Sequence, residues 1–158
     1  MISAPAGDGD AFLMDTLWGA DLAYEAEIWL GATGTGSLLV RSNPSALAGY
    51  RVALDAANRT LALYQRFPGA ADQPLQQRAV MLRRDGWHLL RVVAHGPCLE
   101  VYLDHALQIV HADSTYASGC FGLHARGAVR FRRLRADTTA PPDADWNQRC
   151  EPRHLHLA

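Results

Sequence analysis

Lysine is absent from the 158-residue chain, so arginine supplies all 15 basic side chains against 16 acidic ones. The formal net charge of −1 gives no electrostatic case for a nucleic-acid or anionic-membrane partner. No apolar run approaches the roughly 18 residues that span a bilayer. The first ten residues have neither the basic nor the apolar region of a signal peptide. With 49% hydrophobic and 20% charged residues, the composition is that of an ordinary globular domain.

Cysteine is also scarce, at Cys98, Cys120 and Cys150. An odd number at irregular spacing indicates neither a disulfide framework nor a zinc site, so buried or incidental thiols are the simplest interpretation. One bridge stays open if the protein is secreted. The chain lacks a serine elbow, a P-loop, a dinucleotide motif and histidines at metal-ligand spacing. We therefore expect no cofactor, and no acidic cluster is dense enough to assign a structural calcium ion.

Short β-type segments separated by turns run through the chain, and no long stretch with helical periodicity competes with them. Leu22–Leu30 alternates most clearly, with Glu25 and Glu27 on the face opposite Tyr24. The other expected strands are Ala11–Asp15, Ser37–Ser42, Tyr50–Asp55, Thr60–Phe67, Gln76–Leu82, Trp87–His95, Cys98–Leu103, Ala106–Ala112, Gly119–Ala125 and Ala128–Ala136. This pattern predicts an all-β, antiparallel sandwich of jelly-roll type over residues 1–137. A Pro-rich polar tail follows at residues 138–158.

An ordered set of short motifs adds a family resemblance. The motifs are Gly9-Asp10-Ala11-Phe12, Tyr24-Glu25-Ala26, Leu38-Leu39-Val40-Arg41-Ser42-Asn43, Gly49-Tyr50, Leu54-Asp55-Ala56, Val101-Tyr102-Leu103-Asp104, Asp113-Ser114, Gly119-Cys120-Phe121-Gly122-Leu123 and Val129-Arg130-Phe131. Their order and spacing resemble family 66 carbohydrate-binding modules, which are concanavalin A-like sandwiches at the C-terminal end of family 32 levanases. Such modules begin with a strand carrying a G-x-W motif, which is missing before Gly9.

The resemblance implies a function as well as a fold. It implies a non-catalytic domain that binds the terminal sugars of a levan-type fructan or a related glycan. Its partner is then a catalytic glycosidase domain in the same or a neighbouring chain, outside the cell or in the periplasm. Binding of this kind raises the concentration of the enzyme at polymer ends.

The first candidate site combines Glu25 with Arg41, which fall on motif positions. If both lie on one exposed sheet beside Tyr50, they form a pocket for a terminal sugar. A carboxylate accepts hydrogen bonds from two hydroxyls, a guanidinium donates to neighbouring oxygens, and an aromatic ring covers the apolar face of the sugar. Glu27 and Ser42 are further candidates. The pattern alone favours an ordinary cross-strand ion pair on a solvated sheet, whereas the resemblance favours the pocket.

The second candidate site lies at the end of a later strand. His124 and Arg126 follow the Gly122-Leu123 motif and either line the pocket or lie exposed. They are the next place to expect the site if Glu25 and Arg41 do not form it. Asp104 and Asp113 are better explained as turn residues that bind their own backbone.

Two other functions remain open from the sequence. Glu25 and Glu27 lie about 6.6 Å apart on one strand face, close to the separation of glycosidase carboxylates. However, Trp29 stands where sandwich glucanases carry another carboxylate, so we expect no catalysis. The ending from Gly122 to Leu134 also resembles 3-keto-disaccharide hydrolases. A laminin-G-like protein-interaction domain is the third alternative.

Overall fold

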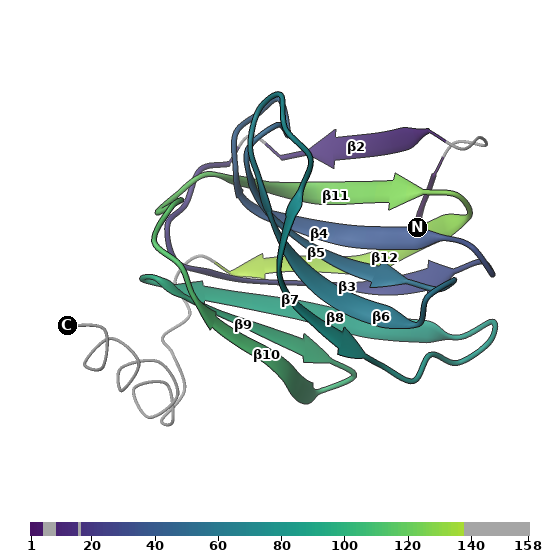
Figure 1. The fold of residues 1–158 in the computed structure, drawn as a ribbon. Helices are drawn as coiled ribbons and strands as arrows, with labels where there is room; N and C mark the ends of the chain where they lie inside the picture. Colours follow the sequence, from purple (N-terminus) through teal and green to yellow (C-terminus); the bar gives the residue numbers. More distant parts are fainter. Residues whose placement is uncertain (5–8, 16, 138–158) are drawn as a thin grey trace.

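The chain folds into two six-stranded antiparallel sheets that stack face to face (Figure 1). The computed structural model describes residues 1–4, 9–15 and 17–137, and these residues contain no helix. Sheet I has the order β1 (Ile2–Ser3), β12 (Val129–Asp137), β3 (Leu22–Leu30), β8 (Trp87–His95), β9 (Cys98–Leu103) and β10 (Ala106–Ala112). Sheet II has the order β2 (Asp10–Met14), β11 (Cys120–Arg126), β4 (Thr35–Ser42), β5 (Gly49–Asp55), β6 (Thr60–Arg66) and β7 (Gln73–Ala79).

The predicted antiparallel β-sandwich is confirmed. Strands β3, β8, β9 and β10 have the predicted bounds, whereas β7 begins three residues earlier than expected and β1 was not expected at all. The short strand β1 pairs with β12 at the edge of sheet I. The predicted tail at residues 138–158 lies outside the described residues, and its assignment stays a prediction.

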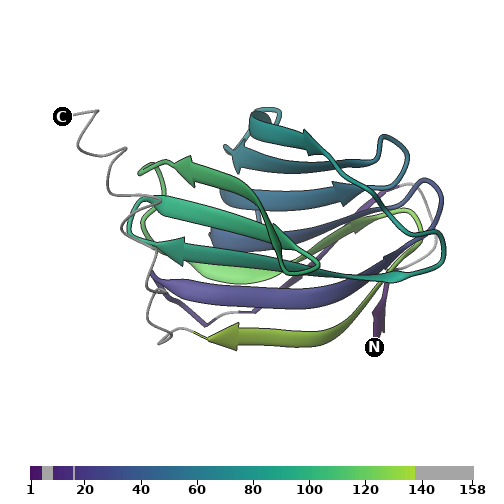
Figure 2. The same ribbon diagram turned by 90° about the horizontal axis from the view of Figure 1, so that it is seen from below.

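Alternation along each strand builds the core between the sheets. Tyr24, Ala26 and Ile28 of β3 point inward and are buried, and their sheet II counterparts include Leu38 and Val52. Figure 2 shows β12 (yellow-green), β3 (purple) and β8 (teal) side by side in sheet I. Because the apolar residues fill the interior, each sheet presents its polar side chains on an outer face.

The cysteines differ from one another. Cys120 is free and buried, as the simplest interpretation expected, whereas Cys98 is disulfide-bonded, which is the alternative left open for a secreted protein. The sequence could not indicate this because the fold, not the spacing, brings such partners together. Over the described ranges, no helix is long and apolar enough to cross a membrane.

Candidate functional site

A row of small side chains hollows the outer face of sheet II. The cross-strand register aligns His124 of β11 with Ser37 of β4, then with Ala53 of β5 and Ala62 of β6. Since serine and alanine fill little space above a sheet, this row leaves a cavity of about 550 Å³.

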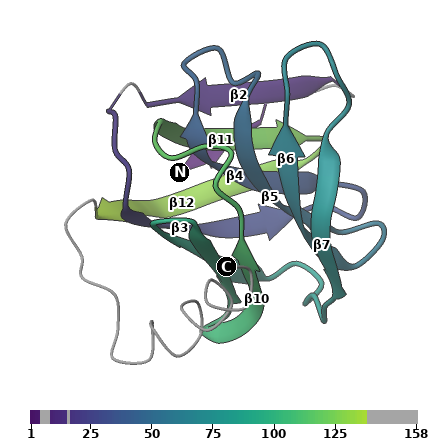
Figure 3. The same ribbon diagram turned by 60° about the vertical axis from the view of Figure 1, so that its left-hand side comes forward.

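Larger and mostly polar side chains surround the hollow. The loop at residues 67–72 joins β6 to β7 and contributes Asp72, and β2 contributes Asp10 and Phe12. Figure 3 shows the β6–β7 hairpin at one edge of sheet II and β2 at the other. The full lining comprises Asp10, Phe12, Thr35, Arg51, Ala53, Asp55, Thr60, Ala62, Tyr64, Arg66, Ala70, Ala71, Asp72, His124 and Arg126.

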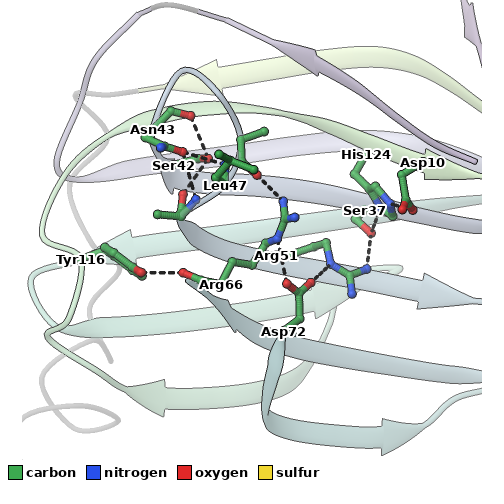
Figure 4. A network of polar contacts seen from close by, with 12 residues as sticks. Asp10, Ser37, Ser42, Asn43, Leu47, Arg51, Arg66, Asp72, Tyr116 and His124 are labelled. Carbon is green, nitrogen blue, oxygen red and sulfur yellow. Dashed lines mark hydrogen bonds and ion pairs between the residues drawn. The ribbon is translucent and has the colours of Figure 1, made fainter. Parts of the chain in front are cut away.

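Two arginines share one carboxylate at this site (Figure 4). The Nε of Arg51 donates to Asp72 Oδ2 at 2.9 Å, and the Nε of Arg66 donates to Asp72 Oδ1 at 3.0 Å. These side chains are only 14%, 15% and 21% exposed for Arg51, Arg66 and Asp72, so solvent screens the pairs incompletely. Arg66 also donates to the carbonyl of Ala46. Asp72 therefore fixes two guanidinium groups at the rim of the hollow.

The floor carries a second chain of hydrogen bonds (Figure 4). Arg51 Nη1 donates to Ser37 Oγ at 3.2 Å, Ser37 Oγ lies 3.0 Å from His124 Nδ1, and His124 Nε2 lies 2.8 Å from Asp10 Oδ1. Burial lowers the pKa of His124 despite its bond to Asp10. The neutral ring then donates from Nε2 to Asp10 and accepts from Ser37 at Nδ1. The hydrogen bond from His124 lowers the pKa of Asp10, which keeps this carboxyl ionised.

The arrangement suits a polyhydroxylated ligand. In the described part of the chain, Nη2 of neither Arg51 nor Arg66 makes a hydrogen bond, which leaves donors for ligand oxygens. The carboxylates of Asp10 and Asp72 supply acceptors. The ring of Phe12 is 43% exposed and lies 5.0 Å from His124, so it supplies an apolar wall.

The predicted site residues do not all meet. His124 and Arg126 line the cavity, as the second prediction allowed. Glu25 lies on β3 of sheet I and Arg41 lies on β4 of sheet II, so the predicted pocket between them on one exposed sheet is wrong. The error arises because the chain passes from sheet I to sheet II between the consecutive strands β3 and β4.

Arg41 is a buried clamp between loops. Its side chain is 1% exposed, its Nε donates to Ala20 at 2.9 Å, and its Nη1 donates to Gly96 at 2.6 Å. It also donates to the Tyr116 carbonyl and pairs with Asp21 at 3.3 Å. Every one of these bonds ties Arg41 to a loop, so the guanidinium is occupied structurally.

A backbone irregularity points Arg41 toward those loops. Its φ of 48° lies in the left-handed region, beside a register shift between β4 and β11. Two glycines make room for it, because a Cβ on Gly49 would lie 2.6 Å from Ser42 and one on Gly119 would lie 2.4 Å from the Arg41 backbone. These glycines belong to two of the motifs that carry the family resemblance.

Tyr50 and Ser42 are also structural. Tyr50 is buried in the core, and its hydroxyl donates to Asp113 Oδ1 at 2.5 Å, so its predicted place beside an exposed sugar is wrong. Ser42 is buried, and its hydroxyl donates to the carbonyl of Ala48 at 2.9 Å. Ser42 therefore organises the loop around Asn43, and Tyr50 organises the loop that runs from Asp113 to Tyr116.

Glu27 shares the outer face of sheet I with Glu25, as predicted. It pairs with Arg132 at 2.5 Å and with Arg133 at 2.8 Å. These ion pairs lower the pKa of Glu27. Because β3 belongs to sheet I and the cavity lies on sheet II, Glu25 and Glu27 are on the opposite side of the sandwich from the cavity.

Both aspartates expected in turns are structural, but only Asp113 binds the backbone of its own loop as predicted, whereas Asp104 bonds strand β8. Asp104 accepts from the Leu89 amide at 2.8 Å and bonds His88 at 2.7 Å, and Asp113 accepts from the Thr115 amide at 2.9 Å. Over residues 1–4, 9–15 and 17–137, no cluster of His, Cys, Asp or Glu could hold a metal ion.

Sequence reasoning missed Arg51, Arg66 and Asp72. A signal for Arg51 was present, since Tyr50, Val52 and Leu54 alternate as inward residues of β5 and place Arg51 outward. Asp72 carried no comparable signal because it lies in a loop, and only the folded β6–β7 connection brings it over the sheet.

Comparison with known proteins gives one clear sequence relative. The chain is 31% identical to the levanase of Bacillus subtilis strain 168 over 125 residues. The match covers 77% of this chain but only 18% of the levanase. No protein-family model matches the chain.

Comparison with solved structures also finds a carbohydrate-binding module of Bacillus subtilis. A family 66 carbohydrate-binding module of Bacillus subtilis superposes with a TM-score of 0.78 at 27% identity, over 84% of both chains. A galectin of Caenorhabditis elegans superposes with a TM-score of 0.62 at 11% identity, over 84% of this chain and 92% of the galectin. The galectin likeness concerns the fold alone.

Proposed function

We propose that this chain, a domain like the family 66 carbohydrate-binding modules, binds the ends of a fructan or related glycan in the cavity on sheet II. The observation that carries this proposal is the pair of guanidinium groups that Asp72 holds over a floor of small side chains. Adjacent sugar hydroxyls accept from Arg51 and Arg66 and donate to the carboxylates, while Phe12 covers an apolar face of the ring.

The site is suited to binding and not to hydrolysis. Glycosidases need one carboxylic acid with a raised pKa to protonate the leaving oxygen. In this cavity the hydrogen bond from His124 lowers the pKa of Asp10, so this acid is not poised to donate a proton, and both carboxylate oxygens of Asp72 accept from arginines. The likeness is to a binding module and to a small part of a levanase, so the domain is an accessory and not an enzyme.

The same relatives suggest a partner and a compartment for the domain. We infer that it serves a catalytic glycosidase domain in a larger protein or a neighbouring chain and works outside the cytoplasm. The disulfide bond of Cys98 supports this inference because disulfides persist in oxidising compartments.

Calorimetric titration tests the proposal. Purified protein is titrated with levan, inulin and short fructo-oligosaccharides, with dextran as the control glycan. Saturable binding to fructans and none to dextran is the expected result. A protein that ignores every fructan lacks the proposed specificity, and release of reducing sugar would contradict the accessory role.

A further inference from the structure

The outer face of sheet I carries arginines in aligned cross-strand rows. The first row joins Arg130, Trp29 and Trp87, and the second joins Arg132, Glu27 and Leu89. The third joins Arg135, Glu25, Arg91 and Tyr102. These ten residues together with Arg133 are called the arginine face.

A bulge in β12 concentrates the cations. Arg133 has a φ of 53°, and the register between β12 and β3 shifts between Arg132 and Arg135. Consecutive strand residues normally point to opposite faces. Here the bulge lets both Arg132 and Arg133 reach Glu27, so two consecutive guanidinium groups lie on the outer face.

Tryptophan rings hold two of these guanidinium groups. Arg130 lies 4.7 Å above the ring of Trp29, and Arg132 lies 3.9 Å above the ring of Trp87. A guanidinium stacked on an indole is held in place while its N–H groups point away from the ring, toward a ligand or, for Nε of Arg132, toward Glu27. The face is therefore ordered before any ligand arrives.

The arginine face has a strong charge bias in a chain of net charge −1. It combines five arginines, namely Arg91, Arg130, Arg132, Arg133 and Arg135, with only Glu25 and Glu27. Along β12 the arginines span the β3 positions from Trp29 to Glu25, which corresponds to about 13 Å of strand. The next row contains Asp137 and Glu100, which end the cationic stretch.

We propose that the arginine face binds a linear anionic polysaccharide with a carboxylate on each sugar, such as a polyuronate. Arginines in line along one strand meet successive carboxylates of an extended chain, whereas a compact anion meets only one or two. Each guanidinium can bind a carboxylate through two parallel hydrogen bonds. The arginine face and the cavity lie on opposite sheets, so both ligands can bind at once.

The test uses polygalacturonate with the full chain, in affinity gel electrophoresis at low and high salt. The row variant Arg130→Gln/Arg135→Gln is compared with Arg78→Gln/Arg84→Gln, which removes the same charge from exposed positions outside the face. We expect the row variant to bind polygalacturonate about tenfold more weakly than the control variant, and high salt to abolish wild-type binding.

Three results would overturn this proposal. They are no wild-type binding at low salt, equal losses in the two double variants, and binding of poly-L-glutamate as tight as that of polygalacturonate, which would assign the face to an acidic protein. Titration of the row variant with fructan distinguishes a failure of the arginine face from a failure of the cavity on sheet II. Unchanged fructan binding there is expected, because the cavity on sheet II is intact.

Discussion

Arg51 donates to Asp72 across the rim of the cavity, and Asp72 accepts from Arg66 on its other oxygen. The carboxylate thus sets the position of both guanidinium groups. An asparagine in its place keeps one acceptor and turns an N–H₂ group toward the second arginine.

We therefore expect Asp72→Asn to weaken glycan binding about tenfold and to lower the free energy of unfolding by only about 1 kcal/mol. Titration and urea unfolding measure the two effects, with Asp85→Asn on an exposed turn as control. Unchanged affinity in Asp72→Asn would show that the bridge does not organise the site.

The small residues of the floor allow a steric test. Ala62 lies in β6 beside the edge strand β7, lines the cavity and shares the aligned row with Ala53. A leucine at residue 62 projects into the hollow and not into the core, so we expect Ala62→Leu to abolish detectable binding while the melting temperature changes little. Normal binding by this variant would place the ligand elsewhere. A large loss of melting temperature would show that residue 62 packs against structure.

Arg41 is expected to matter for stability and not for direct contact with glycan. Arg41→Ala leaves the carbonyls of Ala20 and Gly96 without their partner and removes the pair with Asp21. We expect the free energy of unfolding to fall by about 3 kcal/mol. Chemical denaturation checks this value, with Arg84→Ala as an exposed control. Native stability in Arg41→Ala would contradict the clamp.

The buried imidazole of His124 predicts a pH dependence. Burial lowers its pKa from the ordinary 6.5, so below that pH the unfolded chain takes up a proton that the folded chain does not. The free energy of unfolding should fall as the pH drops below 6.5, and less steeply in His124→Gln. Unfolding curves between pH 7 and pH 5 measure this, with exposed His105→Gln as control. Equal slopes in wild type and His124→Gln would contradict the assignment.

The sequence predicted the fold better than the site, for physical reasons. Alternation along β3 and β8 identifies strands because burial imposes a period of two. It does not say which sheet a strand joins, so Glu25 and Arg41 were wrongly placed together. His124 and Arg126 were anticipated because they follow a motif on their own strand. Asp72 depends on a loop conformation that no periodicity encodes.

The most direct measurement of the central claim is a calorimetric titration of Arg51→Ala with levan-derived oligosaccharides, beside wild type, Glu25→Ala and Arg78→Ala. Arg51 lines the cavity, whereas Glu25 and Arg78 do not. We expect Arg51→Ala to lose about 2–3 kcal/mol of binding free energy, which puts a weak sugar ligand beyond detection. Glu25→Ala and Arg78→Ala should bind like wild type. Wild-type affinity in a natively folded Arg51→Ala protein, or loss of binding in Glu25→Ala, would contradict the proposed site.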